Sequence, residues 1–221
     1  MTKTVLITGA SRGIGQATAE HFLKQDWCVI GTSTTGTQIE SYQNVTMLPL
    51  KLEDESSIMA CVATLISQGI TPDVLVNNAA INPGPDDEYL VPEKVRRTVE
   101  INLLGLISLT EKLLPHILSN GRVINLTSSA SNVNNQHIQQ SLTPYGIAKA
   151  GVNLYTHNLA KRFKDKGLIV VALHPGWVRT DMGSPDAPKV PSDVAEELWG
   201  LATSDIQTDT LWENKRVINW W

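Results

Sequence analysis

The chain has 221 residues, of which 42% are hydrophobic and 18% are charged, so it can bury a sizeable core and global disorder is excluded. Its formal net charge of −4 offers no basic footprint for nucleic acid and no attraction to anionic lipid. No uninterrupted apolar run approaches the roughly 18 residues of a membrane-spanning helix, and two cysteines are too few for a disulfide framework. We therefore expect a cytoplasmic protein with reduced, buried thiols and no nucleic-acid or membrane partner.

Short β-branched runs alternate with helical patterns along the chain. The expected strands are residues 4–8, 28–32, 45–50, 74–77, 122–127, 168–174 and a short one at 210–213. After the first strand, an apolar stripe that starts at Ile14 predicts a helix. Further helices are expected at 54–68, 92–119, 143–166 and 192–203. Continuous apolar strands are typical of parallel sheets, which are covered on both faces. The pattern predicts a single α/β domain over residues 1–221, with three layers and a doubly wound, mostly parallel sheet.

The first strand leads into a glycine-rich turn, Thr8-Gly9-Ala10-Ser11-Arg12-Gly13-Ile14-Gly15. Glycines at a strand-to-helix turn let the backbone approach a pyrophosphate, which then lies at the positive end of the helix. The Gly-x-x-x-Gly-x-Gly spacing differs from the commonest dinucleotide fingerprint, and a tight turn that needs small residues is the alternative. The strand before the turn and the helix after it favour a nucleotide site.

Tyr145 and Lys149 lie four residues apart in an expected helix, so both project from one face. An isolated pair of this kind is most often an ordinary exposed one. A phenol beside an ammonium also suits general acid–base chemistry, because a nearby positive charge favours the phenolate and lowers the tyrosine pKa from its reference value of about 10. Polar residues elsewhere favour the chemical role. Ser128 follows one expected strand, Asn77 ends another, and Asn102 interrupts an apolar helical stretch.

Together these elements resemble the short-chain dehydrogenase/reductase family in its classical form, over about residues 3–180. The resemblance implies a Rossmann-like fold and an oxidoreductase with Asn102, Ser128, Tyr145 and Lys149 as catalytic residues. It also implies a set of cofactor-binding residues, which includes Ser33 and Thr34 after the second strand and Leu52 after the third. The full set is Gly9, Ser11, Arg12, Gly13, Ile14, Gly15, Ser33, Thr34, Leu52, Asn77, Ala79, Tyr145, Lys149, Pro175, Gly176, Val178 and Thr180.

Each catalytic residue takes a role from the family. Tyr145 exchanges the proton, and Lys149 lowers the pKa of Tyr145 and holds the nicotinamide ribose. Ser128 orients the substrate oxygen, and it is chosen over Ser129 because it lies six residues after Arg122. Asn102 anchors a water for proton replacement. Asn77 contacts the cofactor ribose and steadies the central sheet.

The sequence departs from the family pattern at several places. Ala80 stands where the family has glycine, and Lys51 stands where it has an aspartate that contacts the adenine. Asp54, at the start of the helix expected at 54–68, is expected to be a helix N-cap instead. The spacing from Ser128 to Tyr145 predicts an extended loop between them. The stretch 174–183 resembles a short branch of the family that includes the C-factor and sniffer-type carbonyl reductases.

The cofactor preference is expected to be NADP, with NAD less favoured. Ser33 stands where an NAD enzyme carries the carboxylate that repels a 2′-phosphate, so that repulsion is missing. Arg12 is placed to supply the positive charge, because a guanidinium can meet a phosphate with two hydrogen bonds. The alternative is that Arg12 is a solvent-exposed residue of the turn.

The function expected from the resemblance is hydride transfer between NADP(H) and a small-molecule carbonyl or alcohol substrate. The alternative is a catalytically silent NADP-binding sensor or regulator on the same fold, since fold alone does not decide function. A homodimer or homotetramer is expected, and no metal site, because the five histidines show no ligand spacing. The loops 81–91, 129–143 and 181–191 are expected to shape the substrate site, with the last as a candidate lid.

Overall fold

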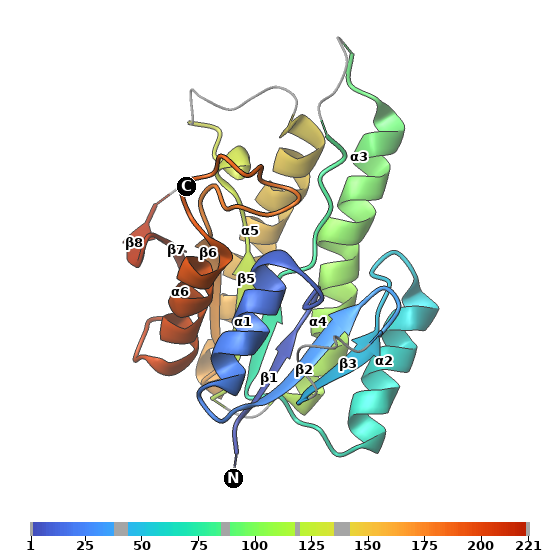
Figure 1. Ribbon diagram of the computed structural model, residues 1–221, viewed down its shortest axis with the longest axis vertical. Coiled ribbons are helices and arrows are strands. Elements are labelled where there is room, and N and C mark those ends of the chain that lie inside the picture. The colour runs from blue at the N-terminus through green and yellow to red at the C-terminus, as the bar shows by residue number, and fades with distance from the viewer. Residues whose placement is uncertain (1, 38–43, 85–88, 118–119, 135–141, 220–221) are drawn as a thin grey trace.

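One sheet runs through the part of the chain that the computed structural model describes, namely residues 2–37, 44–84, 89–117, 120–134 and 142–219 (Figure 1). Its strands, in the spatial order β3-β2-β1-β4-β5-β6-β7-β8, are β1 (Thr4–Ile7), β2 (Cys28–Ser33), β3 (Val45–Pro49), β4 (Val74–Asn77), β5 (Arg122–Leu126), β6 (Ile169–His174), β7 (Thr210–Glu213) and β8 (Arg216–Ile218). All neighbouring pairs are parallel except β7 with β8. The mostly parallel sheet is therefore confirmed.

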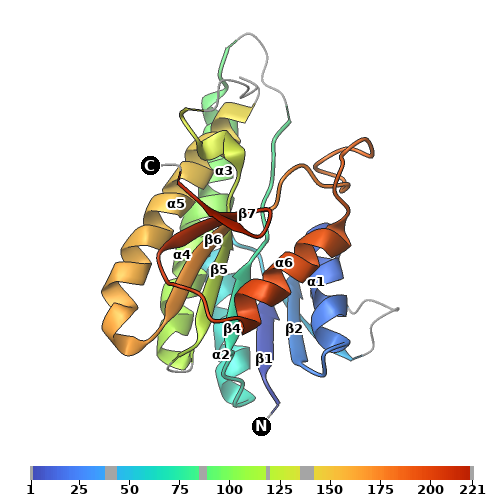
Figure 2. The same ribbon diagram turned by 90° about the vertical axis from the view of Figure 1, so that its left-hand side faces the viewer.

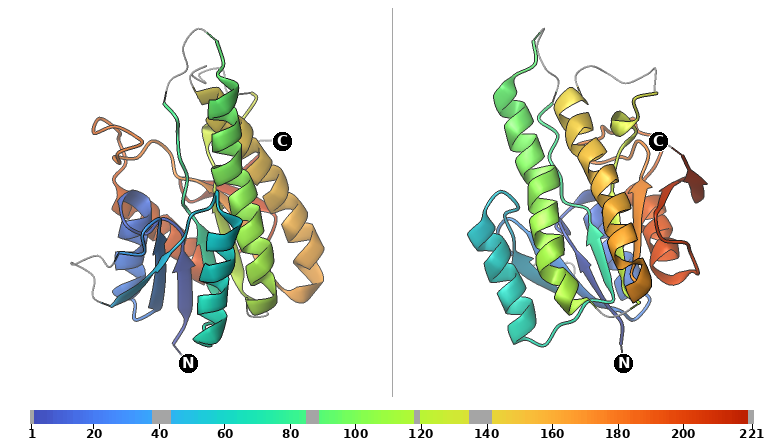
Figure 3. Two further views of the ribbon diagram at one scale, coloured as in Figure 1. Left: turned by 90° about the vertical axis from the view of Figure 1, so that its right-hand side faces the viewer. Right: turned by 180° about the vertical axis from the view of Figure 1, so that it is seen from behind.

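Helices cover both faces of this sheet. They are α1 (Gly13–Leu23), α2 (Glu55–Ser67), α3 (Pro92–Val99), α4 (Leu106–Leu113), α5 (Thr143–Phe163) and α6 (Pro191–Thr203). Helices α1 and α6 pack together on one face (Figure 2), and α2, α4 and α5 lie on the other (Figure 3). The three-layer α/β fold is confirmed.

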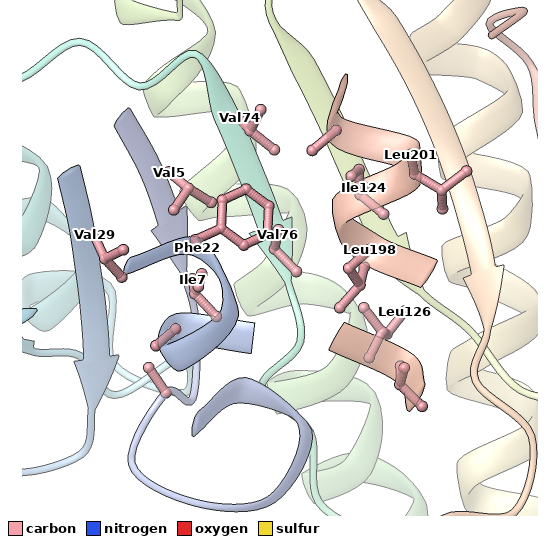
Figure 4. Close-up of a cluster of buried hydrophobic side chains, with 14 of the residues drawn as sticks. Val5, Ile7, Phe22, Val29, Val74, Val76, Ile124, Leu126, Leu198 and Leu201 are labelled. Atoms are coloured by element: carbon pink, nitrogen blue, oxygen red, sulfur yellow. The ribbon is translucent and has the colours of Figure 1, made fainter. Parts of the chain in front are cut away.

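Alternation along the strands divides the core between the two faces. Val5 and Ile7 of β1 point toward Phe22 of α1, and Leu198 of α6 belongs to the same cluster, shown in Figure 4. Leu6, between them in sequence, belongs to the cluster on the opposite face. Successive side chains of a strand point to opposite faces, so a strand covered on both sides must be apolar at every position. This is why β1 reads as an unbroken apolar run.

The strand order reverses between β1 and β4, which are neighbours in the sheet although β2 and β3 separate them in the chain. Crossovers leave this point in opposite directions, so the loops after β1 and β4 diverge and leave a crevice at the carboxyl ends of the strands. The glycine-rich turn follows β1, and Asn78 and Ala79 follow β4. The predicted nucleotide site therefore lies where such sheets bind ligands.

The helix predicted at 92–119 is not one regular α-helix, and this is a correction. A π-helical turn, Glu100–Gly105, joins α3 to α4, and a 3₁₀ turn, Leu114–His116, ends the element. The side chain of Asn102 in the π-turn bonds to the backbone of Ile81. Single π-turns are frequent at functional sites. The predicted N-cap is confirmed, because Asp54 Oδ1 accepts hydrogen bonds from the backbone N–H groups of Ser56 and Ser57.

Two smaller expectations also need correction. Cys28, expected to be buried, is exposed as the first residue of β2, whereas Cys61 is buried. Strand β8 was not predicted; it returns beside β7 through a turn whose residues Asn214 and Lys215 have φ of 50° and 62°. Within the described residues, none of the helices is both long enough and apolar enough to cross a lipid bilayer.

Candidate active site

A cleft of about 1710 Å³ opens at the carboxyl ends of the strands. Its walls come from the segments at the ends of the seven parallel strands β1 to β7 and from the start of α5. Of the residues predicted from the sequence, those that line it are Gly9, Ser11, Arg12, Gly13, Ile14, Ser33, Thr34, Leu52, Ala79, Ser128, Tyr145, Lys149, Pro175, Gly176, Val178 and Thr180. Segments far apart in the chain are thus brought to one site. Gly15, Asn77 and Asn102 are not part of this lining.

The glycine-rich turn is held closely against the loop after β4. Gly9 has a φ of 67°, a left-handed conformation that favours glycine, and a methyl group on Gly15 would overlap the carbonyl oxygen of Gly9. Asn78 Nδ2 donates to the carbonyl oxygens of Thr8, at 2.8 Å, and of Gly9, at 3.1 Å. Asn78 was missed by the sequence reasoning, although it is the second residue of the Asn77-Asn78 pair.

The first turn of α1 has the features of an anion site. Its N-cap, Arg12, makes no capping hydrogen bond through its side chain, and the first turn carries no acidic residue. The positive end of the helix is therefore open to an anion. Arg12 Nε lies 3.5 Å from Asp181 Oδ2 in an ion pair whose two side chains are each 80% exposed. Arg12 thus reaches across the mouth of the cleft to the loop after β6.

Asn77 lies beneath the cleft, where its side chain joins neighbouring elements, and its predicted contact with the cofactor ribose stays a prediction. The Asn77 amide nitrogen donates to Thr110 Oγ1, at 2.9 Å, and to Asn125 Oδ1, at 2.8 Å. Asn125 Nδ2 in turn donates to Thr156 Oγ1. Both amide hydrogens of Asn77 are used within the protein, so its side chain has no donor left for a ribose. This buried chain joins β4 and β5 to α4 and α5.

Asn102 makes two hydrogen bonds to the backbone of one residue. Its Oδ1 accepts from the N–H of Ile81, at 2.8 Å, and its Nδ2 donates to the C=O of the same residue, at 2.7 Å. Asn102 is fully buried. The side chain therefore ties the loop after β4 to the π-turn, and the predicted role of Asn102 in anchoring a water stays a prediction.

Tyr145 and Lys149 lie one turn apart on α5, and both line the cleft. Lys149 is 1% exposed, and its ammonium donates to the carbonyl oxygen of Leu126, at 2.7 Å. It lies 5.5 Å from the centroid of the Tyr145 ring. Burial lowers the pKa of Lys149 to about 8 and raises that of Tyr145 to about 12. The predicted lowering of the tyrosine pKa is wrong for this structure, because burial disfavours the charged phenolate and raises the pKa.

Ser128 caps a 3₁₀ turn, Ser129–Ser131, directly after β5. Its Oγ accepts from the N–H of Ala130, at 3.2 Å, and the cleft is lined by both Ser128 and Ser129. Asn153 Nδ2 donates to Ser131 Oγ, which donates to the C=O of Ser128. The turn is therefore fixed to α5 one helical turn beyond Lys149. Residues 135–141 of the predicted loop lie outside the described part.

The family model for short chain dehydrogenases matches residues 3–190. The chain belongs to the short-chain dehydrogenase family. It is 33% identical to serine 3-dehydrogenase of Rhizobium radiobacter over 188 residues, which cover 82% of this chain and 74% of that enzyme. It is 32% identical to the 3-oxoacyl-acyl-carrier-protein reductase FabG of Vibrio harveyi over 187 residues, or 81% of this chain and 75% of that protein. The NADPH-bound carbonyl reductase from chicken fatty liver has a TM-score of 0.89 at 23% identity and covers 99% of this chain and 94% of that one.

The likeness to the carbonyl reductase shows the Rossmann-like fold, and the expected short branch of the family stays a prediction. In this short-chain dehydrogenase, the polar residues that line the cleft from the end of β6 onward include His174, Lys189, Glu213 and Asn214. Burial and the charge of Lys189 lower the pKa of His174 to about 4. His174 ends β6 and Glu213 ends β7, so these two polar residues could have been found in the sequence by their place at the carboxyl ends of strands. In the described part of the chain, no three or more His, Cys, Asp or Glu side chains are grouped as metal ligands.

Proposed function

We propose that this short-chain dehydrogenase interconverts a carbonyl and a primary or secondary alcohol with NADP(H), using Tyr145 as general acid and base within one domain that spans residues 1–221. The observation that carries the proposal is the placement of Tyr145 and Lys149 on one wall of a cleft whose other wall is the glycine-rich turn. The cytoplasmic location expected from the sequence belongs to the same proposal, and fractionation of cells tests it.

The residues of the cleft fit a nicotinamide dinucleotide. The open N-terminus of α1 suits the pyrophosphate, and Leu52 and Ala79 offer apolar surface toward the adenosine end. Val178 and Thr180 would hold the nicotinamide carboxamide. When bound, the cofactor supplies or accepts the hydride.

The chain's own groups handle the oxygen of the substrate and its proton. In the reductive direction the Tyr145 phenol donates its proton to the oxygen on which negative charge develops, and Ser128 Oγ orients that oxygen by a hydrogen bond. The Lys149 ammonium adds a positive charge on the same side, which stabilises the phenolate that is left. The raised pKa of Tyr145, about 12, keeps the phenol protonated before the reaction, as a general acid requires.

Replacing Tyr145 by Phe tests the proposal. We expect turnover to fall by roughly 10²–10⁴-fold, the usual contribution of general acid–base catalysis, with cofactor affinity retained. NADPH oxidation is measured with aldehydes, ketones, quinones and β-ketoacyl thioesters, and NADP⁺ reduction with serine, because relatives are named for the last two substrates. Activity of the variant within a few-fold of the wild type contradicts the role of Tyr145. Cofactor binding by the wild type without turnover on any substrate supports the silent sensor instead.

The proposed preference for NADP depends on Arg12. Hydrogen bonds to charged groups contribute about 1.5–3 kcal/mol, so Arg12→Ala is expected to lower the ratio of kcat/KM for NADPH over NADH by roughly 10–100-fold. Arg12 must exchange Asp181 for the 2′-phosphate, and since exposed ion pairs contribute little, this exchange costs under about 1 kcal/mol. Lys161→Met, at an exposed position of α5, is the control. An unchanged ratio in Arg12→Ala shows that another group selects the cofactor.

Self-association is proposed through the face formed by the π-turn and α5 (Figure 3). Leu104, Ile147 and Leu154 are large apolar side chains that are 48%, 47% and 62% exposed on these elements. Burying them against a second copy would remove apolar surface from water. We favour a dimer over a tetramer.

A further inference from the structure

An ion pair beyond the proposed catalytic residues joins three segments at the end of β6. Lys189 Nζ lies 2.6 Å from Glu197 Oε1 of α6 and donates to the carbonyl oxygen of Pro175 at 3.1 Å. The side chains of Lys189 and Glu197 are 20% and 5% exposed. Lys189 and Pro175 line the cleft, whereas Glu197 lies behind them. The ammonium therefore connects the turn after β6 to α6 from within the cleft wall.

The backbone of Lys189 holds the same turn. Its N–H donates to the C=O of Trp177, at 3.3 Å, and its C=O accepts from the N–H of Arg179, at 2.9 Å, in a parallel bridge opposite Val178. Along an extended segment successive backbone groups point to alternate sides. With the groups of Trp177 and Arg179 facing Lys189, those of Val178 face the other way. Residue 189 thus sets the direction of the backbone groups of Val178.

The stem of Lys189 supports the turn as well. Gly176 has a φ of 81°, and a methyl group there would lie 3.3 Å from Lys189 Cδ. The turn therefore packs directly against the aliphatic part of the Lys189 side chain, and the ammonium donates a hydrogen bond to the carbonyl of the preceding Pro175.

Stability does not explain this pair. Glu197 Oε2 is buried without a hydrogen-bond partner among the described residues, which costs free energy. Buried ion pairs can often be replaced by apolar side chains with no loss of stability. The cost is accounted for if the pair fixes the shape of the turn.

We propose that Lys189, held by Glu197, is a positioning residue that shapes the Pro175–Val178 turn to receive the nicotinamide end of the cofactor. The inference rests on the proposed function only in that the cleft binds a nicotinamide dinucleotide. It does not involve the adenosine end, where Arg12 and Ser33 lie.

The test compares whole and truncated cofactor on Lys189→Met, which keeps the length of the stem and removes the charge. By calorimetry we expect the Kd for NADPH to rise about tenfold and the Kd for NADH by the same factor. The Kd for 2′,5′-ADP, which has no nicotinamide, should stay within about twofold. Glu197→Gln should also raise the Kd for NADPH. The double variant should bind NADPH with nearly the same Kd as Lys189→Met, because both side chains act through one contact.

Two results overturn the proposal. One is an unchanged Kd for NADPH in Lys189→Met. The other is an equal rise in the Kd values for NADPH and 2′,5′-ADP, which indicates that the substitution disturbs the whole cleft. Arg12→Ala is the matched control, since it should weaken the binding of 2′,5′-ADP and should weaken the binding of NADPH more than that of NADH. Because binding is measured without turnover, the two proposals can fail separately. A wild type that binds NADPH but reduces no carbonyl refutes the proposed function alone, and a Lys189→Met variant that binds NADPH as tightly as the wild type refutes this inference alone.

Discussion

The buried ammonium of Lys149 makes folding stability and activity depend on pH in opposite directions. Burial lowers the pKa of Lys149 from 10.5 to about 8. Since one pKa unit corresponds to 1.36 kcal/mol, keeping this charge inside the folded protein at pH 7 costs about 3 kcal/mol relative to the unfolded chain.

The sign of the effect follows from proton binding. Between pH 8 and 10.5 the unfolded chain holds the proton on Lys149 more strongly than the folded protein does, so stability rises with pH in this window. From pH 8 to pH 10 this one group adds about 2 kcal/mol to the free energy of unfolding. Over the same window kcat/KM for carbonyl reduction is expected to fall, approaching tenfold per pH unit, because the ammonium is lost. Tyr145, with a pKa of about 12, stays protonated and does not cause this fall.

Urea unfolding of the wild type and of Lys149→Met at pH 8, 9 and 10 isolates the contribution. The difference in unfolding free energy between the two proteins should change by about 2 kcal/mol across the series, since all other groups are shared. Tyr145→Phe is the control, and its difference from the wild type should stay nearly constant. If the difference between the wild type and Lys149→Met is also constant, to within about 0.5 kcal/mol, burial does not lower the pKa of Lys149 and the reasoning is refuted.

Two further predictions concern the glycine-rich turn and self-association. Gly15→Ala places a methyl group against the Gly9 carbonyl. It should therefore lower the free energy of unfolding by about 1–3 kcal/mol and weaken NADPH binding. Stability and affinity equal to those of the wild type would mean that the turn adjusts freely. Leu154→Lys places a charge on the proposed contact face, so it should shift a dimer toward the 24 kDa monomer in sedimentation equilibrium. Lys161→Met is the control. A wild type that is already monomeric at micromolar concentration contradicts the dimer.

Elements with strong local signals were predicted within a residue or two. The strand before the glycine-rich turn, the turn and α1 each carry their own pattern: a β-branched run, glycines, and an apolar stripe from Ile14 to Phe22. The N-cap at Asp54 was likewise readable, because a carboxylate just before a helix bonds to N–H groups two and three residues ahead. Such interactions lie within a few residues, so the sequence contains them directly.

The π-turn around Asn102 was missed for the opposite reason. Asn102 is drawn to Ile81, which lies 21 residues earlier in the chain. A methyl group on Gly105 would overlap the carbonyl of Leu52, so the π-turn also depends on the close approach of the segment between β3 and α2. Neither contact leaves a periodic pattern in residues 92–119.

The sequence by itself determined the order of the elements, the α/β class and the residue types at the ends of the strands, because periodicity, caps and turns are local properties. Only the tertiary structure decided what those residues can do. Lys149 loses affinity for its proton because the surrounding fold buries it against Leu126, and Asn77 gives up its donors to Thr110 and Asn125. Lys189 meets Glu197 and Pro175 because the loop after β6 folds back along its own start. Desolvation and long-range hydrogen bonds arise only when distant segments pack together, so they set the pKa values and the positioning roles that no local pattern contains.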